Sequence, residues 1–385
     1  MRILIKGYYG QKNLGDDFLL YSILNTLNQC GKHTVRVVVA EKQYADFFQK
    51  FPNLRLSEIS RPWRRFTKRL ALIGSDVWII GGGGLWPREN TETLKILLSD
   101  IRLARKFGCK IVFYGVDINS AADEEYRAVW KEIMTETDLF VVRNRKTKAI
   151  LDSILDGRAI RSSDLTFGLE TPAEKESSKS ILNKLDLEEG KYIIWAVPME
   201  FKNDPHNVRY HKLIASLSHL ANESALKNFK HALLPYNENR DTQLLQDLSK
   251  QINGPCVVCD SCLDIEEKRL LYRFAKASVS MRFHSVMFSL YHRLPGIYLS
   301  YSDKTSDVLK EYGLEDFMLE YGISAQEDFG KEFDLDEEKL MQLADHALTP
   351  SSEDLERIAA ASDDLKRMAN SAKAIFSEYF SKKRR

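Results

Sequence analysis

The chain has 385 residues, of which 44% are hydrophobic and 29% are charged, the proportions of an ordinary globular protein. This length exceeds that of one ordinary hydrophobic core, so two domains are expected. The formal net charge is +1, because 56 Lys and Arg residues balance 55 Asp and Glu residues, and this balance gives no support to a nucleic-acid-binding function.

The first residues and the cysteines indicate a compartment. Residues 1–10 run directly into a strand-like pattern without a secretory signal, and no apolar stretch approaches the length of a transmembrane helix. The five cysteines are an odd number, which in a chain of this size is typical of a reducing setting. We therefore expect a cytoplasmic protein.

Strand-like runs alternate with amphipathic helical patterns through the first half of the chain. The predicted strands span residues 3–6, 35–40, 77–80, 110–114 and 139–143. Strands separated by helical patterns predict βαβ units and a parallel sheet.

A polar stretch at residues 171–180 interrupts this alternation and predicts a linker. From residue 351 onward the pattern is helical, with an acidic start and a basic end that suit the helix dipole. Between these segments lies a second series of predicted strands, at residues 191–198, 230–236, 256–260, 277–281 and 296–300.

These patterns predict an α/β fold with two Rossmann-like domains facing a cleft. The first domain would span residues 1–172 and the second residues 173–345, followed by a C-terminal helical segment at residues 346–385. Ligands of open α/β sheets bind at the carboxyl ends of the strands, so the loops after the predicted strands are the candidate site.

Two glycine-rich loops follow predicted strands. The first, GYYGQKNLGDD at residues 7–17, leads from a strand into a helix, where such turns usually hold a phosphate, but Asp16 and Asp17 would repel one. The second, IIGGGGLW at residues 79–86, contains four consecutive glycines, more than a tight turn needs. Glycines leave backbone amides uncovered by side chains, and ordering them on folding costs more conformational entropy than ordering other residues. We therefore interpret this loop as ligand-binding.

Cationic side chains follow three other predicted strands. Arg143 ends a mid-chain strand, where a guanidinium can grip a carboxylate or phosphate, although such an arginine also commonly extends to solvent. Arg282 and His284 fall in the turn before an apolar helix, whose dipole disfavours an imidazolium unless a bound polyanion opposes it. Lys304 follows the next strand, and a functional role for it depends on its sharing one cleft with Arg143 and His284.

Two further features are weaker. Cys256, Cys259 and Cys262 form a C-x-x-C-x-x-C pattern, but it lacks an obvious fourth ligand and its first two members lie in a predicted strand, so we expect no metal site. The stretch RPWRRFTKR at residues 61–69 is either a solvated loop or a contact to a membrane surface or lipid-linked diphosphate.

Taken in chain order, these loops resemble the motifs of the polysaccharide pyruvyl transferase family. The resemblance spans roughly residues 3–310, and Asn144 stands where the family commonly has Asp. The matching residues are Gly10, Asn13, Gly15, Asp16, Asp17, Gly81 to Gly84, Arg143, Asn144, Ser280, Arg282, His284 and Lys304.

The resemblance implies a GT-B-like fold and an enzyme without a cofactor. Its donor would be phosphoenolpyruvate, held by the second domain, and its acceptor a nucleotide- or lipid-linked sugar, held by the first. The product would be a cyclic pyruvate ketal, with phosphate released. Because acceptors in this family are often lipid-linked at the inner membrane face, residues 61–69 and the basic tail at 381–385 would permit peripheral attachment.

The resemblance also implies roles on the donor side. Phosphoenolpyruvate carries about three negative charges near neutral pH, which suits catalysis by Arg143, His284 and Lys304. His284 would protonate the methylene carbon of the donor, while Arg143 and Lys304 would hold its carboxylate and phosphate. Arg282 would support them or only neutralise a carboxylate or helix end. The donor-binding residues implied are Arg282, Ser280 and Asn144.

The acidic end of the first loop suits the acceptor. One of Asp16 and Asp17 would accept hydrogen bonds from sugar hydroxyls or act as a base, and the other would cap the helix, with nothing to say which is which. Asn13 would position the loop or donate to the sugar. Gly82 and Gly83 would let the backbone approach the acceptor.

Two other functions remain open alternatives. A GT-B glycosyltransferase that uses a nucleotide sugar would have the same two-domain fold. A catalytically silent carbohydrate-binding protein would tolerate the loss of His284 and Lys304. A dehydrogenase is disfavoured, because no G-x-G-x-x-G motif follows a predicted strand.

Overall fold

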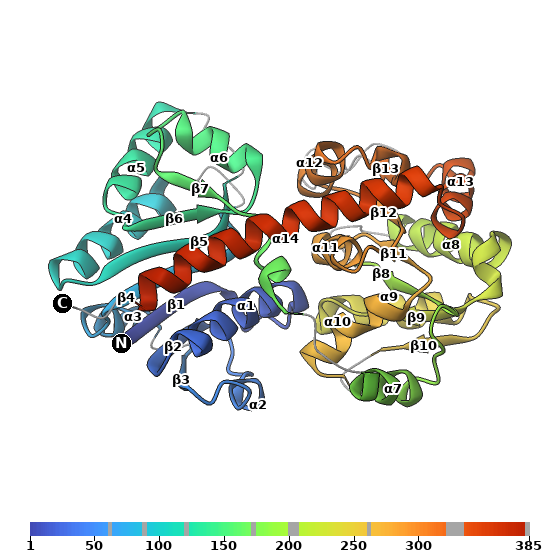
Figure 1. Cartoon of the computed structure of the whole chain (residues 1–385), viewed down its shortest axis with the longest axis horizontal. Coiled ribbons are helices and arrows are strands. Elements are labelled where there is room, and N and C mark those ends of the chain that lie inside the picture. Colours follow the sequence, from blue (N-terminus) through green and yellow to red (C-terminus); the bar gives the residue numbers. More distant parts are fainter. Residues whose placement is uncertain are drawn as a thin grey trace. The chain divides into compact units, whose positions relative to one another are not determined.

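The computed structural model describes residues 1–60, 64–86, 91–118, 123–170, 175–198, 208–259, 263–320 and 335–381. The chain forms two compact units (Figure 1). Unit 1 comprises Met1–Glu170 together with Leu365–Arg385, and unit 2 comprises Thr171–Asp364. The division lies close to the predicted boundary at residue 172, but the C-terminal segment is shared between the units instead of standing apart.

Unit 1 is built around a seven-stranded parallel sheet. Its strands are β1 (Arg2–Tyr9), β2 (His33–Val39), β3 (Leu54–Ile59), β4 (Val77–Trp86), β5 (Lys110–Ile118), β6 (Leu139–Val142) and β7 (Ala159–Arg161). Its helices are α1 (Leu14–Cys30), α2 (Ala45–Phe48), α3 (Arg64–Ile73), α4 (Thr91–Lys106), α5 (Glu124–Thr135), α6 (Arg145–Asp152) and the 3-10 helix η1 (Leu165–Gly168). The strand order is β3-β2-β1-β4-β5-β6-β7.

Both faces of this sheet are covered. Phe113 and Tyr114 are consecutive on β5 and therefore point to opposite faces. Phe113 packs against Trp130 of α5 in one buried cluster. Tyr114 stacks on Phe376, near the end of α14 (Ser352–Ser381), with ring centroids 4.1 Å apart. A strand that is buried on both faces has a continuous apolar run in its sequence, and this run identified β5.

Unit 2 is built around a six-stranded parallel sheet. Its strands are β8 (Tyr192–Ala196), β9 (Lys230–Leu233), β10 (Cys256–Val258), β11 (Ala277–Ser280), β12 (Gly296–Ser300) and β13 (Met318–Glu320). Its helices are α7 (Lys175–Lys184), α8 (Val208–Glu223), η2 (Ala225–Asn228), α9 (Glu238–Ser249), α10 (Ile265–Phe274), α11 (Phe283–Tyr291), α12 (Asp303–Glu311), η3 (Glu315–Phe317), α13 (Glu337–Leu348) and the first part of α14. The strand order is β10-β9-β8-β11-β12-β13.

The strand order reverses once in each sheet. In unit 1 the chain runs outward from β1 to β3 and then crosses to β4, and in unit 2 it runs from β8 to β10 and then crosses to β11. The loops after β1 and β4, and those after β8 and β11, therefore flank the two switch points. Ligands of open α/β sheets bind at such points, outside the carboxyl ends of the strands.

The sequence patterns missed several elements. β7 and β13 have three residues each, too few for a recognisable pattern. β3 lies at a sheet edge with most of its side chains partly or fully exposed, so it lacks an apolar run. The helix α7 begins inside the stretch predicted as a linker, because its Lys and Glu residues are good helix formers despite their polarity.

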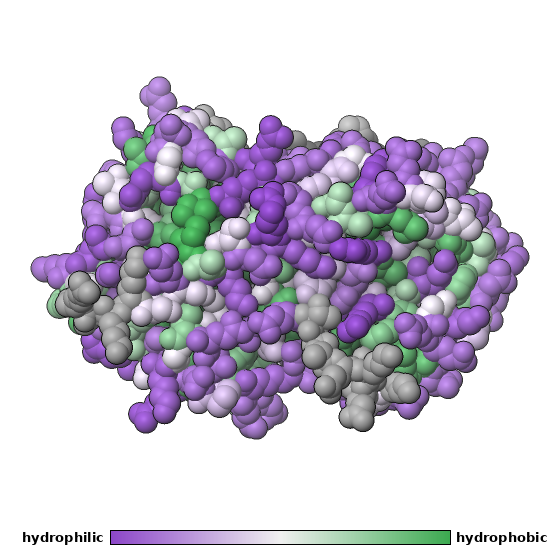
Figure 2. Space-filling view, viewed as in Figure 1, coloured by the Kyte–Doolittle hydropathy of each residue, from purple (hydrophilic) through white to green (hydrophobic). Residues whose placement is uncertain are grey.

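Hydrophilic residues cover most of the face seen in Figure 2, with hydrophobic residues in separate groups between them. Within the ranges that the structure describes, no helix combines the length and the apolar character needed to cross a bilayer.

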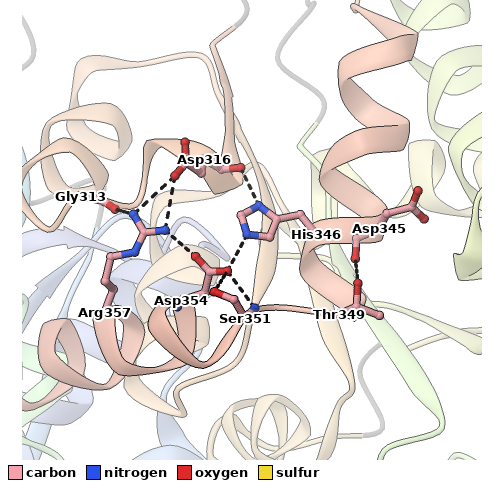
Figure 3. A network of polar contacts seen from close by, with 8 residues as sticks. All are labelled: Gly313, Asp316, Asp345, His346, Thr349, Ser351, Asp354 and Arg357. Atoms are coloured by element: carbon pink, nitrogen blue, oxygen red, sulfur yellow. Dashed lines mark hydrogen bonds and ion pairs between the residues drawn. The ribbon is translucent and has the colours of Figure 1, made fainter.

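A polar network in unit 2 holds the joint between α13 and α14 (Figure 3). His346 places Nε2 2.9 Å from Oδ2 of Asp354 and Nδ1 3.2 Å from the carbonyl oxygen of Asp316. One ring nitrogen of His346 thus faces each of these oxygens. The Ser351 amide, at 2.9 Å, and the Arg357 guanidinium also donate to Asp354. The first turn of α14 is thus fixed by charge-assisted hydrogen bonds.

The substitution Asp354→Asn tests this network. Burial by itself would raise the pKa of Asp354, but hydrogen bonds from Ser351, His346 and Arg357 outweigh it and hold the pKa well below its usual range. Such a carboxylate stabilises the fold above its unfolded-state pKa and loses that contribution as the pH falls toward the folded-state value. We expect Asp354→Asn to lower the unfolding temperature at neutral pH, with the difference from wild type shrinking below about pH 4.

Thermal unfolding followed by circular dichroism at a series of pH values measures this difference. Asp345→Asn is the matched control, because Asp345 is exposed and its carbonyl oxygen, not its carboxylate, accepts from Thr349. A difference between Asp354→Asn and wild type that does not change with pH would contradict the expectation.

Candidate functional site

The residues singled out in the first half of the sequence lie at one edge of the unit 1 sheet. Asp16 and Asp17 are in the first turn of α1, which follows β1, and Gly81–Gly84 form the last part of β4. Because β1 and β4 are neighbours, these residues meet at the switch point. Arg143 follows β6, two strands further along the same sheet.

Asn13 caps the helix that carries the two aspartates. It has an extended backbone, and its side-chain oxygen accepts a hydrogen bond from the amide of Gly15 at 3.1 Å. The prediction that Asp16 or Asp17 caps this helix is therefore wrong, since both lie inside the first turn. Capping α1 agrees with the first of the two roles predicted for Asn13, and its predicted contact with the sugar stays a prediction.

Asp17 is tied to the neighbouring loop after β2. The Tyr44 hydroxyl donates to Asp17 and accepts from the amide of Gly10 at 2.7 Å. Gly10 has φ 75°, which favours glycine, and it is anchored further by a hydrogen bond from the Glu41 amide to its carbonyl oxygen at 3.3 Å. The first glycine loop is therefore a rigid turn held by a buried tyrosine.

The second glycine loop lies against the start of α1. Gly82 and Gly83 have φ of 79° and 89°, values that residues other than glycine rarely adopt. The Tyr9 hydroxyl donates to the carbonyl oxygen of Gly81 at 2.6 Å. A Cβ on Gly83 would lie 3.3 Å from Oδ1 of Asp16. The backbone conformation therefore favours glycine, and a side chain at Gly83 would also press on Asp16.

Arg143 is buried in an ion cluster at the ends of β5, β6 and β7. Its Nε donates to Oδ2 of Asp117 at 2.6 Å, its Nη2 also pairs with Asp117, and its Nη1 lies 3.2 Å from Oδ2 of Asp164. Burial by itself would lower the pKa of Arg143, but the charges of Asp117, Asp164 and Asp16 outweigh it and raise the pKa. The guanidinium stays charged, with two carboxylates balancing it.

Asn144 completes the ion cluster. Its side-chain oxygen caps α6 by accepting from the Thr147 amide at 2.7 Å, and its side-chain nitrogen donates to Oδ1 of Asp117. Aspartate at this position could not donate that bond and would repel Asp117. Asn144 departs from the family pattern, and its amide is suited to the neighbouring carboxylate of Asp117.

The substitution Asp117→Ala tests the ion cluster. It would leave Arg143 buried with one carboxylate and remove the acceptor of the Asn144 amide. Breaking a buried ion pair by deleting one partner costs about 3–5 kcal/mol, so we expect the free energy of unfolding to fall by that order. Urea denaturation measures it. Asp152→Ala, which removes the partly exposed partner of Lys148, is the control and should cost less than about 1 kcal/mol. An equally small loss for Asp117→Ala would contradict the role of the cluster.

The substitution Gly82→Ala tests the packing of the glycine loop. Its Cβ would lie 2.8 Å from the Tyr9 hydroxyl and 2.9 Å from Cβ of Leu19, in addition to the backbone strain. We expect a loss of about 1–3 kcal/mol of stability in urea denaturation. Gly157→Ala separates the two effects, because Gly157 has φ 71° but open space around its Cα. Equal losses for the two variants would show that crowding at Gly82 contributes nothing.

His284 and Lys304 occupy equivalent places after neighbouring strands of unit 2. His284 is the second residue of α11, after β11, and Lys304 is the second residue of α12, after β12. The two strands pair in parallel, so both partly buried side chains belong to one sheet edge, beside the switch point. In both of these helices the N-cap side chain makes no capping hydrogen bond.

Arg282 pairs with a buried carboxylate. Its Nη2 lies 2.7 Å from Oδ1 of Asp241, a residue of α9 with no exposed surface. The other oxygen of Asp241 accepts from the amides of Tyr236 and Asn237 at 3.1 and 2.8 Å. Arg282 therefore neutralises a carboxylate and ties the start of α11 to α9, which is one of the two roles that the sequence allowed.

Ser280 lies beneath α11 in a chain of buried hydroxyls. Its Oγ is 2.6 Å from that of Ser285 and 3.2 Å from that of Ser278. Ser285 continues the chain to Tyr272 at 2.7 Å, and Tyr272 to Tyr236 at 2.9 Å. The chain joins β11 to α10 and to the first turn of α11. The predicted contact of Ser280 with a donor stays a prediction.

The two features discounted in the sequence add little to the site. Cys256 begins β10, Cys259 follows the strand, and Cys262 lies outside the described residues. Burial raises the pKa of Cys256 to about 11, against thiolate formation. Among the residues described, no group of three or more His, Cys, Asp or Glu is arranged to hold a metal ion. Residues 61–63 and the side chains of residues 64–68 are likewise outside the description.

Sequence reasoning missed four residues that organise the site: Tyr44, Asp117, Asp164 and Asp241. Asp117 lies at the end of a strand that was predicted, so the rule that found Arg143 applied to it equally. Asp164 follows β7, whose three residues show no recognisable strand pattern in the sequence. Tyr44 and Asp241 lie in a loop and in a helix, and only the folded chain brings them to the strand ends.

The sequence profile of a known family matches most of the chain. The profile is that of polysaccharide pyruvyl transferase, and it covers residues 13–303. No curated protein matches the chain significantly.

Solved structures with the same fold share little sequence. UDP-GlcNAc 2-epimerase from Neisseria meningitidis, bound to UDP-GlcNAc, is 12% identical with a TM-score of 0.60, and the match covers 100% of both chains. A glycosyltransferase from Rickettsia africae is 12% identical with a TM-score of 0.59, over 100% of this chain and 99% of that chain. A trehalose-6-phosphate synthase is 12% identical with a TM-score of 0.57, over 100% of both chains. The fold is of the GT-B type, as predicted.

Proposed function

We propose, since the chain belongs to the polysaccharide pyruvyl transferase family and is therefore a transferase, that it transfers pyruvate from phosphoenolpyruvate to a sugar. The product would be a cyclic ketal on a glycan precursor, with phosphate released. The observation that carries this proposal is the edge of the unit 2 sheet, where His284 and Lys304 stand in the first turns of two neighbouring helices.

This edge suits a small polyanion. Phosphoenolpyruvate carries about three negative charges near neutral pH, and both cations and helix N-termini favour such a ligand. Lys304 and the positive end of the α12 dipole would hold one anionic group, and the positive end of the α11 dipole the other. The phosphate would then remain bound by the same groups as its charge develops on departure.

His284 would act as the general acid in this reaction. It would give its proton to the methylene carbon of the donor, leaving an oxocarbenium-like centre at C2. One sugar hydroxyl adds to C2, phosphate leaves with the electrons of the C–O bond, and a second hydroxyl closes the ketal. Of the two hydroxyl protons, one replaces that given by His284 and the other leaves with phosphate, so the reaction balances.

We keep the predicted contact between Arg143 and the donor in the proposal, but limit it to hydrogen bonding. Because Asp117 and Asp164 balance the guanidinium, it would offer hydrogen-bond donors to a substrate but little net attraction for an anion. Lys304 and the helix termini of unit 2 are therefore assigned the greater share of the donor's charge.

The edge of the unit 1 sheet would take the acceptor. Asp16 and Asp17 are partly exposed and offer hydrogen-bond acceptors for sugar hydroxyls, and Gly83 lies beside Asp16. An uncharged sugar with many hydroxyls suits such an acidic edge, whereas a phosphate does not.

Peripheral contact with a membrane remains part of this proposal. The helix α3 carries four Lys and Arg residues in the sequence RRFTKRLALI, and its Leu70 is 53% exposed. Cationic and apolar side chains on one short helix favour an anionic membrane surface, where a lipid-linked acceptor would lie.

A glycosyltransferase that uses a nucleotide sugar is the alternative, because the solved structures of this fold include glycosyltransferases and a protein bound to UDP-GlcNAc. The products separate the two reactions. Incubation with phosphoenolpyruvate and a panel of glycans releases inorganic phosphate in one case, and incubation with nucleotide sugars releases a nucleoside diphosphate in the other.

The substitution His284→Gln tests the assigned acid. Glutamine keeps a polar side chain of similar reach but cannot protonate carbon, so we expect kcat for phosphate release to fall at least about 10²-fold. His219→Gln is the control, because His219 lies on the exposed side of α8, about half exposed at 45%. Turnover at the wild-type rate by a correctly folded His284→Gln variant would remove His284 from the mechanism.

A further inference from the structure

We propose that Asp16 is the base that takes the proton of the attacking sugar hydroxyl, and that Asp17 holds the start of α1 in place through Tyr44. This inference rests on the proposed function and divides roles between two carboxylates that are adjacent in the sequence. Successive residues of a helix point about 100° apart, so the two side chains meet different neighbours.

Asp17 faces the β2 side of the sheet edge. Tyr44, which lies after β2 and is only 3% exposed, has one hydroxyl hydrogen. Since that hydroxyl accepts from the Gly10 amide, its hydrogen is directed to Asp17. Burial, together with the charge of Asp17, raises the pKa of Tyr44 well above its ordinary value, so the hydroxyl keeps its proton at any working pH. Asp17 is thereby committed to a structural hydrogen bond.

Asp16 faces the β4 side, toward the switch point. Its Oδ1 is 3.3 Å from the position that a Cβ on Gly83 would take. The charge of Asp16 also reaches Tyr9, whose pKa is raised by burial and by Asp16 and Asp17, and Arg143 at the end of β6. Asp16 is therefore directed toward the middle of the sheet edge, where the strand order reverses and ligands of this fold bind.

The glycines opposite Asp16 let the end of β4 lie closely against the start of α1. Any side chain on Gly83 would lie against the carboxylate, and the φ of both Gly82 and Gly83 disfavours side chains in any case. Gly82 and Gly83 are buried and Asp16 is partly exposed, so its carboxylate is the group that a sugar hydroxyl would reach.

The proton transfer is simple in form. The O–H bond of the hydroxyl breaks, its proton goes to an oxygen of Asp16, and the electron pair left on the hydroxyl oxygen forms the bond to C2 of the donor. The carboxylic acid of Asp16 then loses the proton to water or to the departing phosphate. No oxidant or metal takes part in this step.

The test compares Asp16→Asn with Asp17→Asn in the full-length protein. Phosphate release from phosphoenolpyruvate is measured across a panel of UDP-linked hexoses, UDP-linked hexosamines and nitrophenyl hexosides, as a function of pH. Thermal unfolding is measured for the same variants. Asp46→Asn, which removes an exposed carboxylate on α2, is the matched control for the lost charge.

We expect opposite effects for the two variants. Asp16→Asn should lower kcat at least about 10²-fold, keep KM for phosphoenolpyruvate within about twofold and leave the unfolding temperature near that of wild type. The rise of kcat with pH on the acid side should also disappear. Asp17→Asn and Tyr44→Phe should lower the unfolding temperature and reduce kcat less than about tenfold. Asp16→Glu, which keeps a carboxylate, should recover part of the activity and serves if Asp16→Asn does not fold.

The outcomes separate this inference from the proposed function. Suppose that the wild-type protein releases phosphate, but Asp17→Asn loses more kcat than Asp16→Asn does. This result overturns the assignment of the base and leaves the proposed function standing. An Asp16→Asn variant that changes only KM for the sugar, with the acid-side dependence intact, also overturns it. A wild-type protein that releases no phosphate with any sugar of the panel overturns both.

Discussion

Arg143 joins the carboxyl ends of three neighbouring strands in the unit 1 sheet. Its guanidinium bonds to Asp117 on β5 and to Asp164 beyond β7, while Arg143 itself follows β6. These groups are almost fully buried, so each depends on the others for the hydrogen bonds that water would otherwise supply. The cluster fixes the loops after three strands relative to the sheet, and the charge of Asp16 acts on the same guanidinium.

The two sheets carry opposite chemistry at equivalent edges. In unit 1 the switch point has the carboxylates of Asp16 and Asp17 beside the buried glycines of β4. In unit 2 it has His284 and Lys304 at the starts of two helices whose N-cap side chains do not cap them. An acidic edge suits hydroxyl groups and a basic edge with helix N-termini suits an anion, so the chemistry of the two edges matches a sugar acceptor and an anionic donor.

Fold alone would not distinguish this chain from its structural neighbours. The same GT-B architecture carries an epimerase, a glycosyltransferase and a trehalose-6-phosphate synthase at 12% identity. Function lies in the side chains placed at the strand ends. Hydrogen bonds hold the supporting residues there: Tyr44 bonds to the first glycine loop and to Asp17, and the buried hydroxyls of Ser280 and Ser285 join β11 to the helix that carries His284. Such support is what a site needs to hold reacting groups in fixed geometry.

The sequence by itself determined the alternation of strands and helices, the two-domain division and the family, because buried parallel strands leave apolar runs and ligand loops leave glycines and charges at strand ends. It could not determine which residues meet. Only the tertiary structure decided that Asn13 caps α1, that Asp117 balances Arg143 and that Asp241 balances Arg282, because those partners come from elements far apart in the chain. Short strands such as β7 and β13 were likewise decided by pairing with neighbours, since three residues carry too little pattern to reveal a strand.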